Sequence, residues 1–488
     1  MSQLDRLTRE HDLVASREAP RRAGIKDGRS DLDCELRDSI MTPQVTIQKS
    51  LRDETRPMLS SVPEVHRVRQ TIAAGLLCAL GLLASCNRAA PPPSESASKA
   101  APVDQPWAVS VEPQTIPATG QSAHPHLTTS ARGTILSWLE HRDTTATLKF
   151  SERIDGTWTP ARTVASSDGW FISGADVPTV MRLRDGTLVA TAYPATDVSV
   201  EGYDLQLTHS RDDGQTWSRA IAPHHDGTKT QHGFATLFEL PDSGLGLVWL
   251  DGRDQVLNKT DPDGGSMALY YAAFDRGWKQ TAEAVVNTRV CECCQTTAAM
   301  TDDGPVVAFR DRSPREVRDI NVTRLEQGSW TQPRPLHVDG WQIDACPVNG
   351  PALSARGRTV AAAWFASTGD EGHAYAAFSA DAGRSWTEPV QLDDAVALGH
   401  VDIELLDDGS AVASWVEFAN RRAQLRIRRV RPSGERSVAV AVAGGGDGFV
   451  AGYPRLARHA KELLLAWTET TQDGVSSQQV KVSRVGVD

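Results

Sequence analysis

The sequence predicts an all-β fold, a β-propeller with seven four-stranded blades rather than six, whose ring is closed by the N-terminal strand of the domain. From residue 107 onward one unit recurs: an apolar strand, a turn with glycine, a strand ending in an aromatic residue, and two further strands. The second-strand aromatics, separated by 55, 56, 60, 55, 51 and 52 residues, are Trp138, Tyr193, Trp249, Phe309, Trp364, Trp415 and Trp467. Such a period, with four short strands in each unit, is typical of propeller blades.

The turn glycine supports this count, because six units carry it before the second strand: Gly133, Gly186, Gly244, Gly304, Gly357 and Gly409. The last unit, 453–487, lacks an evident fourth strand. The stretch 107–113 offers one, and pairing it there would remove an open sheet edge. We therefore expect 107–113 to be the outermost strand of the last blade.

Two units carry the eight-residue motif Ser-x-Asp-x-Gly-x-Thr/Ser-Trp, at 210–217 and 379–386. On these motifs the sequence resembles the sialidase (BNR, Asp-box) superfamily. The resemblance implies that each motif is a turn facing away from the active site, so that Asp212 and Asp381 stabilise blades and are not catalytic. Catalytic sialidases have six blades, and the seven units counted here depart from that pattern.

The N-terminal region is typical of a bacterial lipoprotein. Residues 71–85 are apolar, shorter than the ~20 residues of a spanning helix, and end before Cys86 in a sequence that resembles a lipobox. We expect the protein to be exported and lipid-anchored to the bacterial cell envelope, at the outer membrane, on its periplasmic or surface face. The expected segments are a non-native or disordered extension (1–57), a signal peptide that starts at Met58 and ends at lipidated Cys86 (58–86), a flexible Pro/Ser/Ala tether (87–106), and the propeller (107–488).

The net charge of −11 argues against a nucleic-acid partner, because phosphate binding requires a basic face. The expected partners are a glycan or another small anionic ligand, together with the membrane through the lipid anchor.

In a propeller, the loops that follow strand two and the loops that lead into strand one meet at the same end of the ring. Several of these loops are charged, and the unit 291–351 is richer in charged, Cys and Trp residues than the others, so we expect a site at this end. The ligand-binding candidates are Arg142, Asp251, Arg253, Arg310 and Arg312. The catalytic candidates are Arg310, Asp311, Arg312, Arg318, Asp319, Tyr193 and Glu417.

The first interpretation of these residues is glycan chemistry, because guanidinium groups suit the carboxylate of sialic and uronic acids. The resemblance implies that an active protein would be an exo-sialidase-like glycoside hydrolase. The Arg-Ile-Pro motif of that family is absent, however, and no Tyr/Glu nucleophile pair is recognisable. Whether the protein is an enzyme therefore stays open. The alternatives are a non-catalytic binding or scaffold propeller, and arginines that pair with neighbouring carboxylates at Asp311, Glu316 and Asp319.

The second interpretation concerns the cysteines of the folded part. An exported protein meets an oxidising compartment, so we expect disulfides, with Cys346 bonded to one of Cys291, Cys293 and Cys294. No cofactor is favoured. The alternative is copper or zinc bound at the propeller axis by thiolates and imidazoles. Its candidate ligands are His124, His126, His232, Cys291, Cys294, Cys346 and His400.

Overall fold

The computed structural model describes residues 104–105, 107, 109–197, 201–257, 265–369, 371–444, 449–470 and 477–487. The expected extension 1–57, the signal peptide with Cys86 and most of the tether lie outside these residues, so what the sequence predicts for them stays a prediction. Within the described ranges, no helix is long and apolar enough to cross a membrane.

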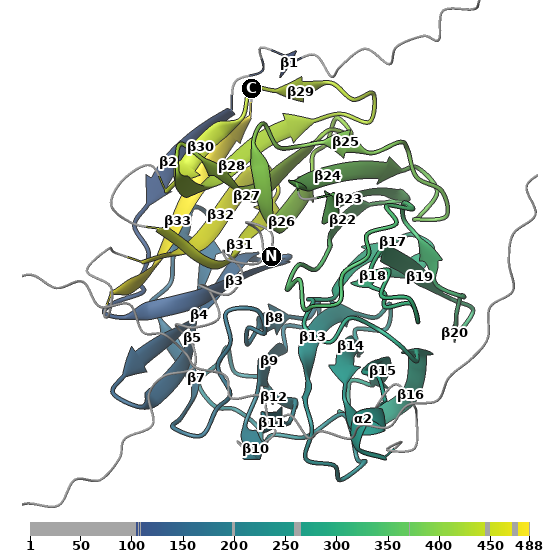
Figure 1. Ribbon diagram of the computed structural model, residues 1–488. Coiled ribbons are helices and arrows are strands. Elements are labelled where there is room, and N and C mark those ends of the chain that lie inside the picture. Colours follow the sequence, from purple (N-terminus) through teal and green to yellow (C-terminus); the bar gives the residue numbers. More distant parts are fainter. Residues whose placement is uncertain are drawn as a thin grey trace, which may run out of the picture. The chain divides into compact units, whose positions relative to one another are not determined.

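Seven sheets of at least three strands follow one another along the chain and around a ring (Figure 1). The first blade consists of β3 (Ser122–Ser130), β4 (Gly133–Arg142), β5 (Thr145–Ile154), β6 (Thr157–Trp158) and β7 (Arg162–Ser167). The second consists of β8 (Val180–Arg182), β9 (Leu188–Ala192) and β12 (Gln206–Ser210), with the hairpin β10 (Ala195–Asp197) and β11 (Gly202–Tyr203) inserted. The third consists of β13 (His232–Glu239), β14 (Leu245–Asp251), β15 (Ala268–Phe274) and β16 (Gln280–Asn287), with the short helix α2 (Arg253–Leu257) after β14.

The remaining blades continue around the ring. The fourth consists of β17 (Thr297–Thr301), β18 (Gly304–Arg310), β19 (Ile320–Glu326), β20 (Ser329–Trp330) and β21 (Arg334–Pro335). The fifth consists of β22 (Ala352–Arg356), β23 (Thr359–Thr368), β24 (Glu371–Ser379) and β25 (Val390–Gln391). The sixth consists of β26 (Val396–Leu405), β27 (Ala411–Ala419), β28 (Arg422–Val430), β29 (Arg436–Ser437) and β30 (Val440–Ala443), with β1 (Asp104–Gln105) at its edge. The seventh consists of β31 (Phe449–His459), β32 (Glu462–Thr470), β33 (Gln478–Val487) and β2 (Val109–Gln114).

The predicted seven blades and the predicted ring closure are both confirmed. Strand β2 pairs antiparallel with β33, from Val109 opposite Val487 to Gln114 opposite Val482, and it is the outermost strand of the last blade. The second blade departs from the expected four strands. Within its described residues only the single bridge between Leu207 and Ile221 occupies the outer position.

The second strand of each blade is buried on both faces, because the sheets of the two neighbouring blades pack against it. All seven residues of β14 are buried, for example, so the apolar and polar alternation of a half-exposed strand is absent there. The predicted second-strand aromatics lie in or directly after these strands and are at most 6% exposed. They form the large side chains of the core between blades.

The two Asp-box-like motifs fold into the same hydrogen-bonded turn at the end of strand three. In the first, Ser210 Oγ donates to Asp212 at 2.7 Å, while the backbone amides of Gly214 and Thr216 donate to Ser210 Oγ at 2.8 Å and to Asp212 at 2.9 Å. In the second, at 379–386, the corresponding distances are 2.7, 2.9 and 2.9 Å. Both carboxylates are therefore used within their own turns.

A β-bulge recurs near the start of strand one in four blades. The register shifts there in β3, β13, β26 and β31. One residue of each bulge has a left-handed backbone: His124, Phe234, His400 and Gly452, with φ of 55°, 53°, 52° and 68°. These bulges re-aim the chain where it turns into the innermost strand, and they place two of the predicted site histidines.

Candidate functional site

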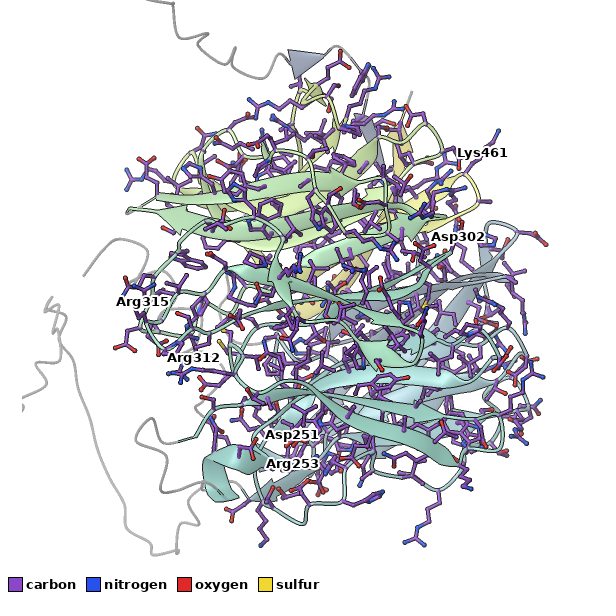
Figure 2. The ribbon with its side chains drawn as sticks, turned by 90° about the vertical axis from the view of Figure 1, so that its right-hand side faces the viewer. Asp251, Arg253, Asp302, Arg312, Arg315 and Lys461 are labelled. Atoms are coloured by element: carbon purple, nitrogen blue, oxygen red, sulfur yellow. The ribbon has the colours of Figure 1, made fainter. Side chains whose placement is uncertain are left out.

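The two ends of the propeller carry different loops. Figure 2 views the ring from its side, with Arg312 and Arg315 on one side and Asp302 and Lys461 on the other. Arg312 and Arg315 follow the second strand of their blade, whereas Asp302 and Lys461 lie in turns between first and second strands. We call the first end the rim face and the second end the turn face.

Four free cysteine thiols gather on the rim face. Cys291, Cys293 and Cys294 lie between β16 and β17, and Cys346 lies between β21 and β22. Cys291 Sγ is 3.0 Å from Cys294 Sγ and 3.8 Å from Cys293 Sγ, and the thiol of Cys346 contacts that of Cys293. No disulfide joins cysteines in the described residues, and the expected bond of Cys346 to the 291–294 loop stays a prediction. The thiols of both loops gather into one cluster instead of bonding in pairs.

A guanidinium group lies against this thiol cluster. Arg318 is buried and donates from Nη1 to Cys291 Sγ at 3.3 Å and from Nη2 to Glu316 at 2.7 Å. Burial by itself would raise the pKa of Cys291. The adjacent thiols and the positive charges of Arg310 and Arg318 outweigh burial and hold this pKa well below its ordinary value. Cys291 therefore has thiolate character.

Arg312, which was expected to bind a ligand, is engaged by carboxylates of its own chain. Its Nε lies 3.0 Å from both carboxylate oxygens of Glu316, and its Nη1 bonds Glu292. Glu316 therefore bridges Arg312 and Arg318. This agrees with the alternative from the sequence in which the arginines pair with neighbouring carboxylates.

Arg310 is interior, which corrects its expected roles in ligand binding and catalysis. Its side chain is 1% exposed. It donates to the backbone carbonyls of Asn349, Arg318 and Phe365 at 2.8, 2.6 and 2.7 Å and packs 4.8 Å from the ring of Trp341. These bonds engage three of its five N–H groups and join three segments of the rim face, and burial keeps the side chain away from the surface where a ligand would bind.

Several rim carboxylates hold tryptophans of the core rather than facing a cleft. Trp249 and Trp415 donate their indole N–H groups to the acid two residues later, Asp251 and Glu417, at 2.8 and 2.9 Å. Both acids are at most 1% exposed. Asp251 also holds Arg253, whose Nη2 lies 2.7 Å from it. This corrects the expected ligand-binding role of Asp251 and the expected catalytic role of Glu417, because a buried indole N–H requires an acceptor.

The remaining catalytic candidates are also bonded within the fold. Tyr193 is 1% exposed and hydrogen bonds the buried carboxylate of Asp176, which Tyr203 also binds at 2.9 Å. Asp319 accepts the backbone amide of Trp341 at 3.1 Å. Asp311 accepts a hydrogen bond from the side-chain amide of Asn287 at 3.0 Å. These contacts account for the three side chains as parts of the rim scaffold.

The seven predicted metal ligands do not meet at one point. The described clusters of potential ligands contain either Cys291, Cys293 and Cys294 or His232, but not Cys346, His124, His126 or His400. His400 stacks on Tyr453 with ring centroids 4.3 Å apart, and its Nδ1 is 2.8 Å from a backbone carbonyl. His124 and His400 lie in the bulges of different blades, β3 and β26. Their imidazoles therefore pack on different side chains.

Arg142 is exposed, as a ligand-binding arginine requires, and forms no ion pair among the described residues.

A different, arginine-rich hollow, which the sequence did not reveal, lies on the turn face. It encloses about 530 Å³. It is lined by Arg132, Arg182, Asp185, Gly186, Thr187, Arg211, Asp213 and Arg276. The sequence pattern did not reveal the hollow, because its four arginines come from four separate turns and strands.

No protein-family model matches the chain, and no curated protein matches it. Among solved structures it is similar to an ulvan lyase of family PL25 bound to -[GlcA(1-4)Rha3S]-, with 11% identity over 77% of this chain and 96% of that one and a TM-score of 0.52. A protein of unknown function from Dyadobacter fermentans shows 14% identity over 78% and 99% of the two chains, with a TM-score of 0.46. The NanB sialidase of Streptococcus pneumoniae shows 10% identity over 72% and 83%, with a TM-score of 0.40. At such identities the likeness to the lyase shows a shared propeller fold.

Proposed function

We propose that the four thiols on the rim face bind a thiophilic metal ion, Cu(I) or Zn(II), and that they do so on an exported propeller anchored by lipid at Cys86. The observation that carries the proposal is the convergence of Cys291, Cys293, Cys294 and Cys346 from two loops. Thiolates around a tetrahedral ion are about 3.8 Å apart, given metal–sulfur bonds of ~2.3 Å. The 3.8 Å between Cys291 and Cys293 fits this spacing, and the 3.0 Å between Cys291 and Cys294 needs a small opening.

The charges around the cluster support the same function. Several thiolates around one ion carry excess negative charge, which buried cations offset. Arg318 bonds Cys291 directly, and the positive charge of the buried Arg310 also acts on that thiol. Soft thiolate ligands favour Cu(I) and Zn(II) over hard cations.

The test is Cu(I) binding to the full chain, purified in detergent and reduced. We expect one bound copper that is lost in Cys291→Ser and in Cys346→Ser. A chain with Arg315→Ala, an exposed residue on the same face, serves as the control and should bind copper normally. Unchanged copper binding in Cys291→Ser would overturn the proposal. A second result would also overturn it. If the chain isolated from cells without reductant has the mass expected for two disulfides among these four cysteines, no thiol is left to bind Cu(I).

A second candidate function is the binding of an acidic glycan, and the hollow on the turn face favours it. Four arginines and two aspartates line this hollow. Arg211 and Arg276 have no carboxylate partner among the described residues, so their charge is available to an anion. The structurally similar ulvan lyase binds a glucuronate-containing chain, which is a ligand of this class.

The test of this second function is the affinity of oligoglucuronate for the full chain. Loss of binding in Arg211→Ala with Arg276→Ala would locate the ligand on the turn face. Loss in Arg142→Ala alone would locate it on the rim face instead. Equal affinity in the wild-type chain and both variants would exclude both arginine sets.

A further inference from the structure

A second cluster of ligating side chains lies between the second and third blades, apart from the cysteines. His224 lies in the loop before β13, and His232 is the first residue of β13. Their rings stack with centroids 3.8 Å apart and planes within 2° of parallel. They are 6% and 0% exposed, whereas the side chain of the adjacent Asp204 is 31% exposed. Only His232 was a sequence candidate, although the run His-His-Asp at 224–226 was a usable signal.

One edge of the stacked pair faces a fixed carboxylate. Asp226 Oδ2 lies 3.1 Å from His232 Nε2 and 3.4 Å from His224 Nδ1. The backbone amide of Thr228 holds the other oxygen of Asp226 at 2.9 Å. A carboxylate only accepts, so the ring nitrogens that face it carry the protons. The lone pairs of both neutral rings are then on His224 Nε2 and His232 Nδ1.

These two lone pairs emerge at the opposite edge of the stack, beside a second carboxylate. His224 Nε2 and His232 Nδ1 are buried and have no hydrogen-bond partner among the described residues. Each faces Asp204 Oδ1, at 3.9 and 3.6 Å. Three acceptors thus meet with no donor among them. Buried acceptors in this arrangement are costly unless a cation or a proton lies between them.

The spacing of the three atoms suits a metal ion better than a shared proton, and the rings, which lie within 2° of parallel, must tilt for both lone pairs to point at one ion. Ligand atoms about 2.1 Å from a tetrahedral ion are about 3.4 Å apart. The distances from Asp204 Oδ1 to the two nitrogens exceed this value by a few tenths of an ångström, and the three atoms lie within 4.8 Å of one another. A hydrogen bond, by contrast, needs heavy atoms within ~3.2 Å.

From this arrangement we propose that His224, His232 and Asp204 bind a divalent transition-metal cation of the zinc type, with Asp226 as the positioning residue for both imidazoles. Imidazole and carboxylate ligands suit Zn²⁺ and its spectroscopic substitute Co²⁺. A carboxylate behind each histidine is the usual outer partner in such sites. The partial exposure of Asp204 leaves a path for the ion and room for a water or ligand as the fourth donor.

Cobalt binding to the full chain, stripped with chelator and kept reduced, tests the proposal independently of the cysteines. Cobalt held by nitrogen and oxygen gives visible absorption without thiolate-to-metal charge transfer, whereas the thiol cluster would give the charge-transfer band. We expect the nitrogen/oxygen spectrum in the wild-type chain and in His225→Ala, a matched control whose side chain is the exposed neighbour of His224.

The same signal should disappear in His224→Ala and in Asp204→Asn, and Asp226→Asn should weaken cobalt binding about 10- to 100-fold. Asp204 is partly exposed, so Asp204→Asn should leave the metal-free melting temperature unchanged and thereby separates lost ligation from lost folding. Zinc should raise the melting temperature of the wild-type chain but not of Asp204→Asn. The proposal is overturned if the wild-type chain shows no nitrogen/oxygen-type cobalt absorption beside any thiolate charge-transfer band, or if Asp204→Asn and His224→Ala keep that nitrogen/oxygen-type absorption. In either case, protons alone hold the histidine pair.

Discussion

The guanidinium Nη1 of Arg318 lies 3.3 Å from the sulfur of Cys291, in a part of the rim face where both side chains are buried. Removing this charge in Arg318→Ala should raise the pKa of Cys291, because the thiolate loses a close opposite charge. The ultraviolet absorbance of thiolates, followed against pH in metal-free protein, measures this change. Arg315→Ala, an exposed arginine nearby in the same loop, is the control and should leave the titration in place. If the titration curve of Arg318→Ala coincides with that of the wild-type chain, the contact between Arg318 and Cys291 does not determine the pKa of the thiol.

Glu417 should contribute to stability through the indole of Trp415. Glu417→Ala leaves a buried N–H without its acceptor at 2.9 Å, which should lower the free energy of unfolding by about 1–3 kcal/mol. Urea denaturation provides the measurement. Glu469 occupies the same place after Trp467, but that indole has no hydrogen-bond partner among the described residues. Glu469→Ala should therefore cost no more than ~0.5 kcal/mol, and equal losses for the two variants would contradict this role of the acid.

Arg310→Met should destabilise the fold strongly. The substitution keeps much of the apolar stem but leaves three buried carbonyls without donors, so we expect a loss of roughly 3–5 kcal/mol. Thermal or urea unfolding measures the loss, with Arg142→Ala as an exposed control expected within about 0.5 kcal/mol of wild type. A variant as stable as wild type that fails to bind acidic glycans would restore the ligand role first predicted for Arg310.

Asp176 should make stability depend on pH. Burial raises its pKa to about 6, although hydrogen bonds from Phe234, Tyr193 and Tyr203 lower it in part. The folded pKa exceeds the unfolded value near 3.8, so folding binds a proton between these values. This contribution to stability is fully present below about pH 4 and is lost as pH rises through about 6. The loss amounts to ~3 kcal/mol at 1.36 kcal/mol per unit.

The variant Asp176→Asn should remove that dependence. Unfolding free energies of both chains between pH 4 and 7 provide the comparison. We expect the wild-type chain to weaken relative to the variant as the pH rises, and parallel curves would exclude Asp176 as the titrating group.

Cys86→Ala should release the protein from membranes. The residue lies outside the described part of the chain, and the expectation rests on the lipobox-like sequence before it and the Pro/Ser tether after it. Fractionation of cells in carbonate buffer measures the release, with Cys78→Ala, within the apolar segment, as a control that should stay with the membranes. Retention of Cys86→Ala in the membrane fraction would argue against lipid anchoring at this position.

The repeats made the architecture predictable from the sequence alone. The aromatic period determined the seven blades, since one large side chain per second strand fills the space between adjacent sheets. The missing fourth strand of the last unit and the free strand before the first determined the closure by β2, because an open edge is costly. The sequence also determined which loops share the rim face, since alternating strands fix the end at which each loop emerges.

The partners of individual side chains were decided only by the tertiary structure. Arg310, Asp251 and Glu417 are charged residues at the rim-face ends of second strands, and the sequence is the same whether they face a ligand or a neighbouring strand. The structure buries them against carbonyls and indoles, because the second strands stay enclosed between neighbouring blades up to their rim-face ends. Likewise, the convergence of His224, His232 and Asp204 depends on the packing of one blade against the next. The spacing of residues along one blade does not determine how close side chains from two blades lie. This site could therefore be found only from the tertiary structure.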